Sequence, residues 1–438
     1  MATGILNTGV RTEADAALAL LGEYTENKSV PLQSAAFMGL GLAYCGSHRE
    51  DIISYILPHV SDDSVSMEVS SLAALSLGFI FVGSKNGDIS SSMLQTLLEK
   101  HEAGDKGLDE KWAKFFVLGL ALLFLGGSLF QISCVQTSAH VAIHQLTGAQ
   151  EESDATIEFL KAIDHPVSKT AQVLVDACAY AGTGNVLKIQ GMLHHCDDHI
   201  GVPLEGGKEE KDDKIDDTFQ AFAVIAISLI AMGEDIGAEM ALRQFNHLVS
   251  PFCTCFAALT LIWLFVDQMH YGEPVIRKAV PLAIALVSAS NPQLPLLDTL
   301  SKYSHDNDLG VALNAIFAMG IVGAGTNNAR LAQMLRQLAG YYQKEPDCLF
   351  MVRVAQGLVH MGKGTIGINP FFCDREIMNK SAVAAILGVL TAFIDAKSCK
   401  SRFLTTLHSW VTYLMVQSFL TSTIGCFSSL CLRCTLDS

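Results

Sequence analysis

The sequence predicts an all-α protein, an α-solenoid of repeated helix pairs. Three observations predict it. A motif of small residues recurs along the chain, helical patterns of apolar residues lie between its copies, and no strand-like alternation competes over most of the chain. Sequence repeats of about 20 to 50 residues are typical of stacked supersecondary units. A chain of 438 residues with 50% hydrophobic content can bury one large continuous core of this kind.

The recurring motif is a run of Gly and other small residues that ends in Gly-Ser or Gly-Thr, as in residues 39–47, 77–84 and 318–326. The successive gaps between copies are 37, 43, 56, 51, 57, 35 and 37 residues. The shorter gaps define a period that accommodates two helices and their turns. One turn position per copy gives the series Gly46, Gly83, Gly126, Gly182, Gly233, Ser290, Gly325 and Gly362.

One helix of each pair is expected to carry a stripe of large apolar residues. Residues 89–100 show it at spacings of i, i+4, i+5, i+8 and i+9. Asp88 stands just before this helix and is expected to cap its first amides. Thr12 and Asp15 are expected to start a similar helix over residues 13–24. The stripe consists of Ile89, Met93, Leu94, Leu97 and Leu98.

The other helix of each pair is rich in Gly and Ala. Each Gly inside a helix costs about 1 kcal/mol relative to Ala, so repeated Gly must be offset by packing. We expect close approach of neighbouring backbones in a tightly wound inner layer, with the Gly-Ser or Gly-Thr that follows forming a left-handed C-terminal turn. The helix glycines in question are Gly39, Gly41, Gly78, Gly119 and Gly320.

Composition narrows the classes of partner. The net charge is −15 with 29 basic residues and no basic stripe, which argues against a nucleic-acid partner. An acidic surface suits basic or mixed-charge proteins instead. The chain has 12 Cys, and those such as Cys45 and Cys178 lie in apolar helices. With irregular spacing and no signal peptide, they favour a reducing compartment.

Several long stretches resemble the proteasome/cyclosome repeat proteins, and the resemblance extends over most of the chain. It is closest to one of the two repeat scaffolds of the proteasome regulatory particle, with the sister scaffold as the alternative. The resemblance implies that the repeats belong to a toroid of two concentric helix rings, as in the family. The matching stretches are residues 40–51, 81–88, 177–190, 231–243, 298–306, 318–339 and 355–364.

What the resemblance implies for function is a docking platform in ubiquitin-dependent degradation, in the cytoplasm and nucleus, and not an enzyme. The implied partners are the proteasomal ATPase ring, ubiquitin chains, the ubiquitin-like domains of shuttle receptors, and a deubiquitinase. The resemblance implies that the helices around residues 88–99 receive ubiquitin and ubiquitin-like domains, with acidic side chains meeting a basic patch on the ligand. Asp88 and Glu99 match acidic positions, Ser92 lies between them, and Gln95 is neutral where some members are acidic. The alternative is an ordinary solvated helix face.

The resemblance also suggests how the chain is organised. Residues 1–397 are expected to form part of a repeat toroid that lacks early repeats, and residues 398–438 an off-pattern tail. Residues 127–147 and 249–268 interrupt the period, and removing their 21 and 20 residues leaves gaps of 35 and 37. We interpret both as translated introns or gene-model errors. Residues 206–217 are charged and are expected to form a solvated loop.

Other motifs suggest chemistry but lack a necessary part. Residues 357–364 have the spacing of a phosphate-binding loop, so a nucleotide hydrolase is a remote alternative. Gly364 stands where that loop needs Ser or Thr, and a helix precedes it where a strand should. Residues 194–199 place His195 and His199 at i, i+4, but no second cluster completes a metal site. Cys431 and Cys434 likewise have no partner pair. The sequence therefore predicts no catalytic residue, cofactor or metal.

Two uncharged stretches of 18 residues, 115–132 and 249–266, reach the minimum length of a membrane span. The first contains the repeat motif over residues 118–126 and is expected to be a buried inner helix. The second lies in a predicted insertion. Neither is accompanied by an intramembrane charge pattern or a loop asymmetry, so the sequence predicts no membrane partner.

Overall fold

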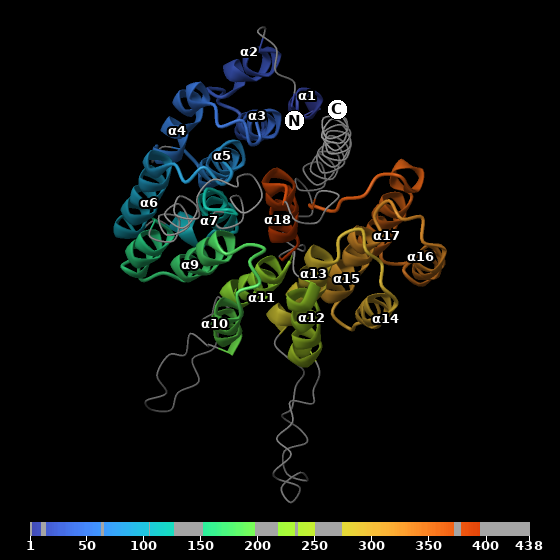
Figure 1. Ribbon diagram of the computed structural model, residues 1–438. Coiled ribbons are helices and arrows are strands. Elements are labelled where there is room, and N and C mark those ends of the chain that lie inside the picture. The colour runs from blue at the N-terminus through green and yellow to red at the C-terminus, as the bar shows by residue number, and fades with distance from the viewer. Residues whose placement is uncertain are drawn as a thin grey trace, which may run out of the picture.

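The computed structural model describes residues 2–9, 15–62, 65–104, 106–126, 152–197, 218–232, 235–249, 274–371 and 378–394. Within these ranges the elements are helices, and the extended pairing consists of one isolated bridge between Phe371 and Met378. The all-α prediction is confirmed for this part of the chain. Figure 1 shows the helices arranged as an arc in two layers, with α1 and α17 at its ends.

The inner layer consists of consecutive helices that pack side by side along the arc. Most of them are buried nearly all round: every residue of α5 except Glu68 is buried, and so is every residue of α11 except Thr218. A helix that is apolar on all sides is typical of a protein core. The inner helices are α1 (Ala2–Leu6), α3 (Val30–Ala43), α5 (Met67–Ile80), α7 (Ala113–Leu122), α9 (Pro166–Ala179), α11 (Thr218–Ala231), α13 (Pro274–Val287), α15 (Leu309–Val322) and α17 (Pro346–Val359).

The outer layer alternates with the inner one along the chain. Its helices bury one face only, as their amphipathic sequences predict. Short 3-10 turns adjoin several helices, at Gly22–Tyr24, Glu50–Ile52, Lys106–Asp109 and Met361–Gly364. The outer helices are α2 (Ala16–Leu21), α4 (Ile53–Ser61), α6 (Gly87–Glu102), a helix over residues 152–161, α10 (Val186–Asp197), α12 (Asp235–Val249), α14 (Leu294–Tyr303) and α16 (Ala329–Tyr341).

The turn positions inferred from the repeat are left-handed at every described copy, with φ between 56° at Ser290 and 71° at Gly182. Gly233 lies outside the described residues. The turns also join neighbouring repeats, because the turn N–H donates to a carbonyl near the end of the next inner helix. The donor–acceptor distance is 2.9 Å from Gly46 to Phe79 and 3.0 Å from Gly83 to Leu122. These bonds satisfy carbonyls that a helix end otherwise leaves without partners.

Glycines of the inner helices lie where backbones approach closely, as predicted. A Cβ atom added to Gly78 would lie 2.5 Å from the carbonyl oxygen of Gly119, and one added to Gly41 would lie 3.0 Å from the Cα of Ser76. Both distances are too short for an ordinary Cβ contact. Because an added Cβ atom has no room, these positions accept only Gly unless the neighbouring helix shifts.

One helix stands apart from both layers. α18 (Lys380–Ile394) lies inside the arc, where it contacts α5, α7 and α13 (Figure 1). Its residues from Ala382 to Phe393 are all buried. The last helix of the predicted repeat region is therefore a central helix that fills the middle of the arc.

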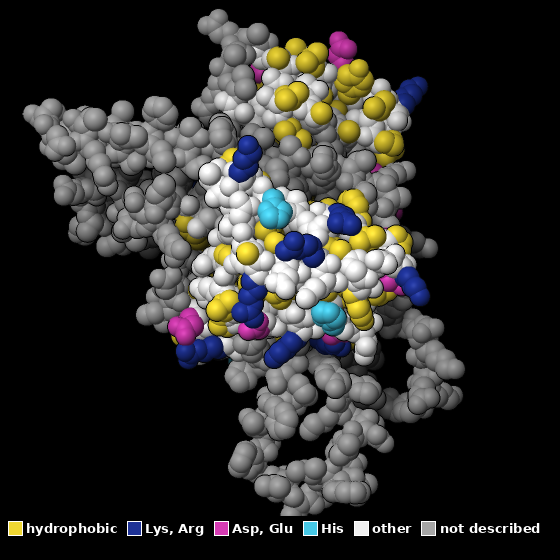
Figure 2. Space-filling view, turned by 90° about the vertical axis from the view of Figure 1, so that its right-hand side faces the viewer, with side chains coloured by type: hydrophobic (Ala, Val, Ile, Leu, Met, Phe, Trp, Pro, Cys, Tyr) yellow, Lys and Arg dark blue, Asp and Glu magenta, His cyan; other side chains and the backbone are white. Residues whose placement is uncertain are grey.

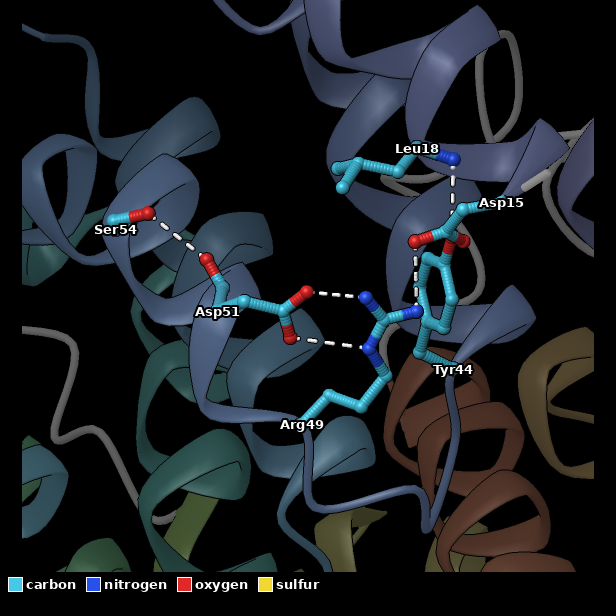
Figure 3. Close-up of polar contacts among 6 residues, drawn as sticks. All are labelled: Asp15, Leu18, Tyr44, Arg49, Asp51 and Ser54. Carbon is cyan, nitrogen blue, oxygen red and sulfur yellow. Dashed lines mark hydrogen bonds and ion pairs between the residues drawn. The ribbon is translucent and has the colours of Figure 1, made fainter. Parts of the chain in front are cut away.

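The predicted helix start at Asp15 is wrong. α2 begins at Ala16, Asp15 has φ 41° and makes no capping bond, and Thr12 lies outside the described residues. Asp15 instead accepts hydrogen bonds from Tyr44 and from Arg49, whose Nη1 lies 2.7 Å from the Asp15 Oδ2 (Figure 3). Arg49 also pairs with Asp51. The carboxylate therefore joins two neighbouring repeats, a role that local sequence cannot indicate.

Several predicted boundaries fall outside the described residues. These are the insertion 127–147, the charged loop 206–217, the tail 398–438, and the insertion 249–268 apart from Val249, which ends α12. Across the first insertion, Gly126 donates to the carbonyl of Cys178 at 3.0 Å, as turn glycines do elsewhere in the arc. The described repeats on the two sides of residues 127–151 are therefore neighbours.

Candidate docking surface

The predicted docking residues lie on α6, an outer helix with one buried face. Ile89, Met93 and Leu97 of the apolar stripe are buried against the arc. The cap is Asn86, whose Oδ1 accepts from the amides of Asp88 at 3.0 Å and Ile89 at 3.2 Å. The prediction that Asp88 caps this helix is therefore wrong. Asp88 lies in the first turn, where its negative charge still favours the positive end of the helix dipole.

The four predicted residues share the solvent side of α6. Asp88, Gln95 and Glu99 are exposed and Ser92 is half-buried. Gln95 Nε2 donates to Glu99 Oε1 at 2.8 Å, and Ser92 Oγ donates to the carbonyl of Asp88 at 2.8 Å. The structure therefore joins the side chains of Gln95 and Glu99, whereas the Asp88 carboxylate makes no described contact with the other three side chains.

A groove of about 650 Å³ lies between α6 and the helix over residues 152–161. Leu94, Leu98 and Phe159 form its apolar walls, and Phe159 is 39% exposed. Sequence reasoning found Gln95 and Glu99 but missed the groove, because its second wall comes from another repeat. The lining residues are Ser91, Leu94, Gln95, Leu98, Glu99, Glu102, Ala155, Thr156 and Phe159.

Two carboxylates line this groove. Glu99 and Glu102 line it from α6, and the second helix exposes further carboxylates close by in sequence. An apolar floor with a negative rim attracts a ligand that combines an apolar centre with positive charges around it. The further carboxylates belong to Glu152, Asp154 and Glu158.

The opposite end of the arc has a different surface. Figure 2 shows the face over α14, α16 and α17, where Lys, Arg and His side chains outnumber Asp and Glu. Three exposed cations of this face are Arg336 on α16, Arg353 on α17 and Lys344 in the turn between them. The α6 groove, which Glu99 and Glu102 line, differs in charge from this face.

The motif at residues 357–364 forms a repeat turn. Its first three residues end α17, and Gly362 and Lys363 are both left-handed, with φ of 56° and 55°. A phosphate-binding loop instead joins a strand to a helix, so the structure gives no support to a nucleotide site at this position.

The histidine motif ends α10 at Asp197, and His199 lies outside the described residues, as do Cys431 and Cys434. Among described residues, no group of three or more His, Cys, Asp or Glu side chains could hold a metal ion. In the same part of the chain, each helix is too short or too polar to cross a bilayer.

Comparison with known proteins identifies the repeat. A profile of the proteasome/cyclosome repeat family matches residues 35–69 and 314–347. The chain is 47% identical over 418 residues to the 26S proteasome regulatory subunit rpn-1 of Neurospora crassa, covering 95% of this chain and 40% of that protein. It is 47% identical over 410 residues to the corresponding rpn1 of Schizosaccharomyces pombe, covering 94% and 40%.

A third relative is the 26S proteasome non-ATPase regulatory subunit 2 of Dictyostelium discoideum, 40% identical over 401 residues, which cover 92% of this chain and 38% of the relative. The chain therefore spans about two fifths of the length of these relatives. The repeat profile, the left-handed turn series and these similarities agree. The chain belongs to the proteasome/cyclosome repeat family, and its relatives are named as 26S proteasome regulatory subunit rpn-1 and as 26S proteasome non-ATPase regulatory subunit 2.

Proposed function

We propose that this chain is the repeat scaffold of a proteasome regulatory subunit in the cytoplasm and nucleus, and that it works by binding and not by catalysis. The support is its similarity to relatives named as 26S proteasome regulatory subunits. Outer surfaces of the arc would contact the ATPase ring, ubiquitin chains and a deubiquitinase. A buried inner layer suits this role, because a rigid framework holds separate docking surfaces at fixed positions.

The α6 groove is the docking surface proposed for the ubiquitin-like domain of a shuttle receptor. The single observation that carries this proposal is the groove itself, with Leu98 and Phe159 as apolar walls and Glu99 and Glu102 at its rim. A ligand with a basic patch around an apolar centre can bury that centre against Phe159 while its cations face the rim. Asp88 extends the negative surface toward the start of α6.

The energetics indicate that no single carboxylate dominates. One exposed ion pair contributes roughly 0.2–1 kcal/mol, because water and salt screen it. The apolar walls supply binding energy through burial, and the charges mainly select the partner and speed its approach. Gln95 contributes no charge but holds the Glu99 side chain by a hydrogen bond of 2.8 Å.

The test is a double charge reversal on α6. The variant Asp88→Lys with Glu99→Lys is titrated with an isolated ubiquitin-like domain of a shuttle receptor. We expect the affinity to fall by about tenfold or more, because two attractions become repulsions. Circular dichroism checks that the helices remain folded.

A matched control carries the same change of charge at another outer position. Glu23→Lys with Glu26→Lys alters two exposed carboxylates beside α2, away from the groove. This variant should bind as the unaltered chain does. If the Asp88 and Glu99 reversals leave the affinity unchanged while the helical signal is intact, the groove is not the docking site.

A further inference from the structure

The ends of the outer helices α14 and α16 meet in a cluster of aromatic rings. The ring centroid of Tyr341 lies 5.2 Å from that of His305 and 4.8 Å from that of Tyr342. Tyr342 is buried, and its hydroxyl donates to the carbonyl of Ser304 at 2.6 Å. His305 Nδ1 lies 3.0 Å from the carbonyl oxygen of Ser301. Both neighbours of the Tyr341 ring are therefore held against the end of α14.

Tyr341 itself lies at the surface. It is 65% exposed, the highest value among the Phe, Tyr and Trp residues that the structure describes. A ring that its neighbours already hold in place loses little freedom when a partner covers it. Tyr is also one of the residues that most often dominate the binding energy of protein interfaces. The exposed ring is therefore suited to be the centre of a contact.

The surface around this ring is positively charged. Residues 326–344, which contain α16 and the turns on either side, include Arg330, Arg336 and Lys344 but no Asp or Glu. The whole chain, in contrast, has a net charge of −15. All three cations are exposed, and Arg330 pairs with Asp298 of α14 at 2.8 Å. A local excess of positive charge thus lies on an acidic protein, on the face shown in Figure 2.

Two lysines flank the aromatic cluster. Lys302 lies three residues before His305 at the end of α14, and Lys344 lies three residues after Tyr341, just past the end of α16. Both lysines are exposed, and neither forms an ion pair in the described part of the chain. Their ammonium groups are therefore available to the carboxylates of a partner.

A cavity of about 550 Å³ adjoins His305, between the turn that follows α14 and the start of α13. Its two carboxylates already have cationic partners, since Asp306 pairs with Arg277 and Asp308 lies 3.5 Å from the Nζ of Lys278. The cavity can thus receive a polar group of a ligand beside the aromatic cluster without repelling a negative charge. The lining residues are Arg277, His305, Asp306, Asn307 and Asp308.

We propose that the surface formed by Lys302, His305, Tyr341 and Lys344 binds an acidic segment of another protein. An apolar side chain of this segment packs on the Tyr341 ring, and Asp or Glu side chains on either side of it pair with the two lysines. Charge complementarity selects a segment of this kind. It disfavours a nucleic acid, because a long polyanion also meets the rest of a chain whose net charge is −15.

The surface is formed by two consecutive outer helices, so both of its walls are present in this chain. Its charge is opposite to that of the α6 groove, which Glu99 and Glu102 line. The two surfaces therefore suit different partners, and this inference does not depend on the α6 groove.

The first test selects ligands from a library of random short peptides displayed on phage. The purified chain and its Lys302→Glu with Lys344→Glu variant serve as parallel targets. We expect the peptides that bind the unaltered chain and not the variant to carry Asp or Glu on both sides of an aromatic or aliphatic residue. If no peptide distinguishes the two targets, or if those that do are basic, the proposal is wrong.

The second test measures affinity. The most enriched peptide is synthesised with a fluorescent label and titrated with the chain by anisotropy. Tyr341→Ala should weaken its binding by about tenfold or more, and the affinity should fall as salt is raised. Circular dichroism checks that the helices of each variant remain folded. A peptide whose affinity survives Tyr341→Ala does not bind this surface, and that result overturns the proposal.

Matched controls carry the same changes at other outer positions. Tyr24→Ala removes a 45% exposed ring beside α2, and Lys28→Glu with Lys161→Glu reverses two exposed lysines elsewhere. Both variants should bind the peptide as the unaltered chain does. The charge reversals of the α6 groove should not weaken binding either. A peptide that loses affinity in those reversals binds the groove, which would contradict a separate surface on α14 and α16.

Discussion

The ring of Phe393 stacks on the ring of Phe317, with centroids 4.0 Å apart and planes 15° from parallel. Phe393 belongs to the central helix α18 and Phe317 to the inner helix α15, and both are buried. The contact ties the end of α18 to the second half of the arc, while α18 also packs on α5 and α7 in the first half. The central helix therefore links parts of the chain that are far apart in sequence.

Replacement of this ring should destabilise the whole arc. Phe393→Ala removes a buried aromatic side chain and its stacking contact with Phe317. We expect the free energy of unfolding to fall by roughly 3–5 kcal/mol. Urea titration followed by circular dichroism measures the change. Phe350→Ala, at a 38% exposed ring, is the control and should cost much less. Equal effects of the two substitutions would contradict a structural role for the central helix.

The close packing of the inner layer should be sensitive to a single methyl group. In Gly78→Ala the new Cβ atom would lie 2.5 Å from the Gly119 carbonyl oxygen, so the helices must separate. We expect a destabilisation of about 1–3 kcal/mol, as is typical of an overpacked core. Gly191→Ala, in open space on α10, should instead stabilise by up to about 1 kcal/mol through helix propensity. Thermal melts of the two variants should therefore shift in opposite directions.

The free energy of unfolding should also fall at alkaline pH, because Tyr44 loses its proton there. Burial, together with the hydrogen bond to Asp15, raises the pKa of Tyr44 to about 12. An unfolded tyrosine titrates near pH ~10, so the stabilising contribution of the protonated phenol is present below that pH. It is lost as the pH rises from there toward about 12.

The measurement is the free energy of unfolding across this pH range. Tyr44→Phe should be less stable at neutral pH, because the Leu18 amide loses its acceptor at 3.0 Å, and its stability should fall less steeply at high pH. Some slope should remain, since burial also raises the pKa of Tyr303 and Tyr342 to about 12. Tyr24→Phe, at an exposed ring, is the control. An unchanged slope in Tyr44→Phe would exclude Tyr44 as its source.

Phe159 tests the apolar part of the groove, which the charge reversals leave unchanged. Phe159→Ala should weaken binding of a ubiquitin-like domain by about tenfold, since an aromatic side chain buried at an interface contributes more than 1 kcal/mol in many complexes. Tyr341→Ala removes a 65% exposed ring from the far end of the arc and should leave the affinity unchanged. If Phe159→Ala binds normally, the ligand does not enter the groove.

The local features of the fold could be predicted from sequence because they recur. Each turn glycine, such as Gly46 or Gly325, follows an inner helix at a similar spacing, and the left-handed conformation they adopt is one that Gly accepts without strain. The small-residue helices also indicate close packing, because the helix-propensity cost of Gly78 in a helix interior has to be offset by packing. The two wrong predictions both concern helix starts. Asn86 caps α6 in place of Asp88, and the Asp15 side chain caps no helix but accepts hydrogen bonds from Tyr44 and Arg49.

The sequence predicted only part of the candidate site. Gln95 and Glu99 lie on one helix, so helical spacing alone places them together, and the structure adds their hydrogen bond of 2.8 Å. Phe159 comes from another repeat, beyond a segment that breaks the period, and no spacing rule connects it to Leu98. A groove between two helices depends on how the repeats pack, which periodicity does not specify.

The sequence by itself determined the repeat, its helical content and the small-residue inner layer, because turn chemistry and backbone approach are set by the residue at each position. Only the tertiary structure decided that residues 380–394 form a central helix, that Asp15 joins Tyr44 and Arg49, and that the ring of Tyr341 lies beside that of His305. Those outcomes depend on which repeats meet across the arc. Contacts between distant segments arise from the packing of the whole chain, and no local pattern encodes them.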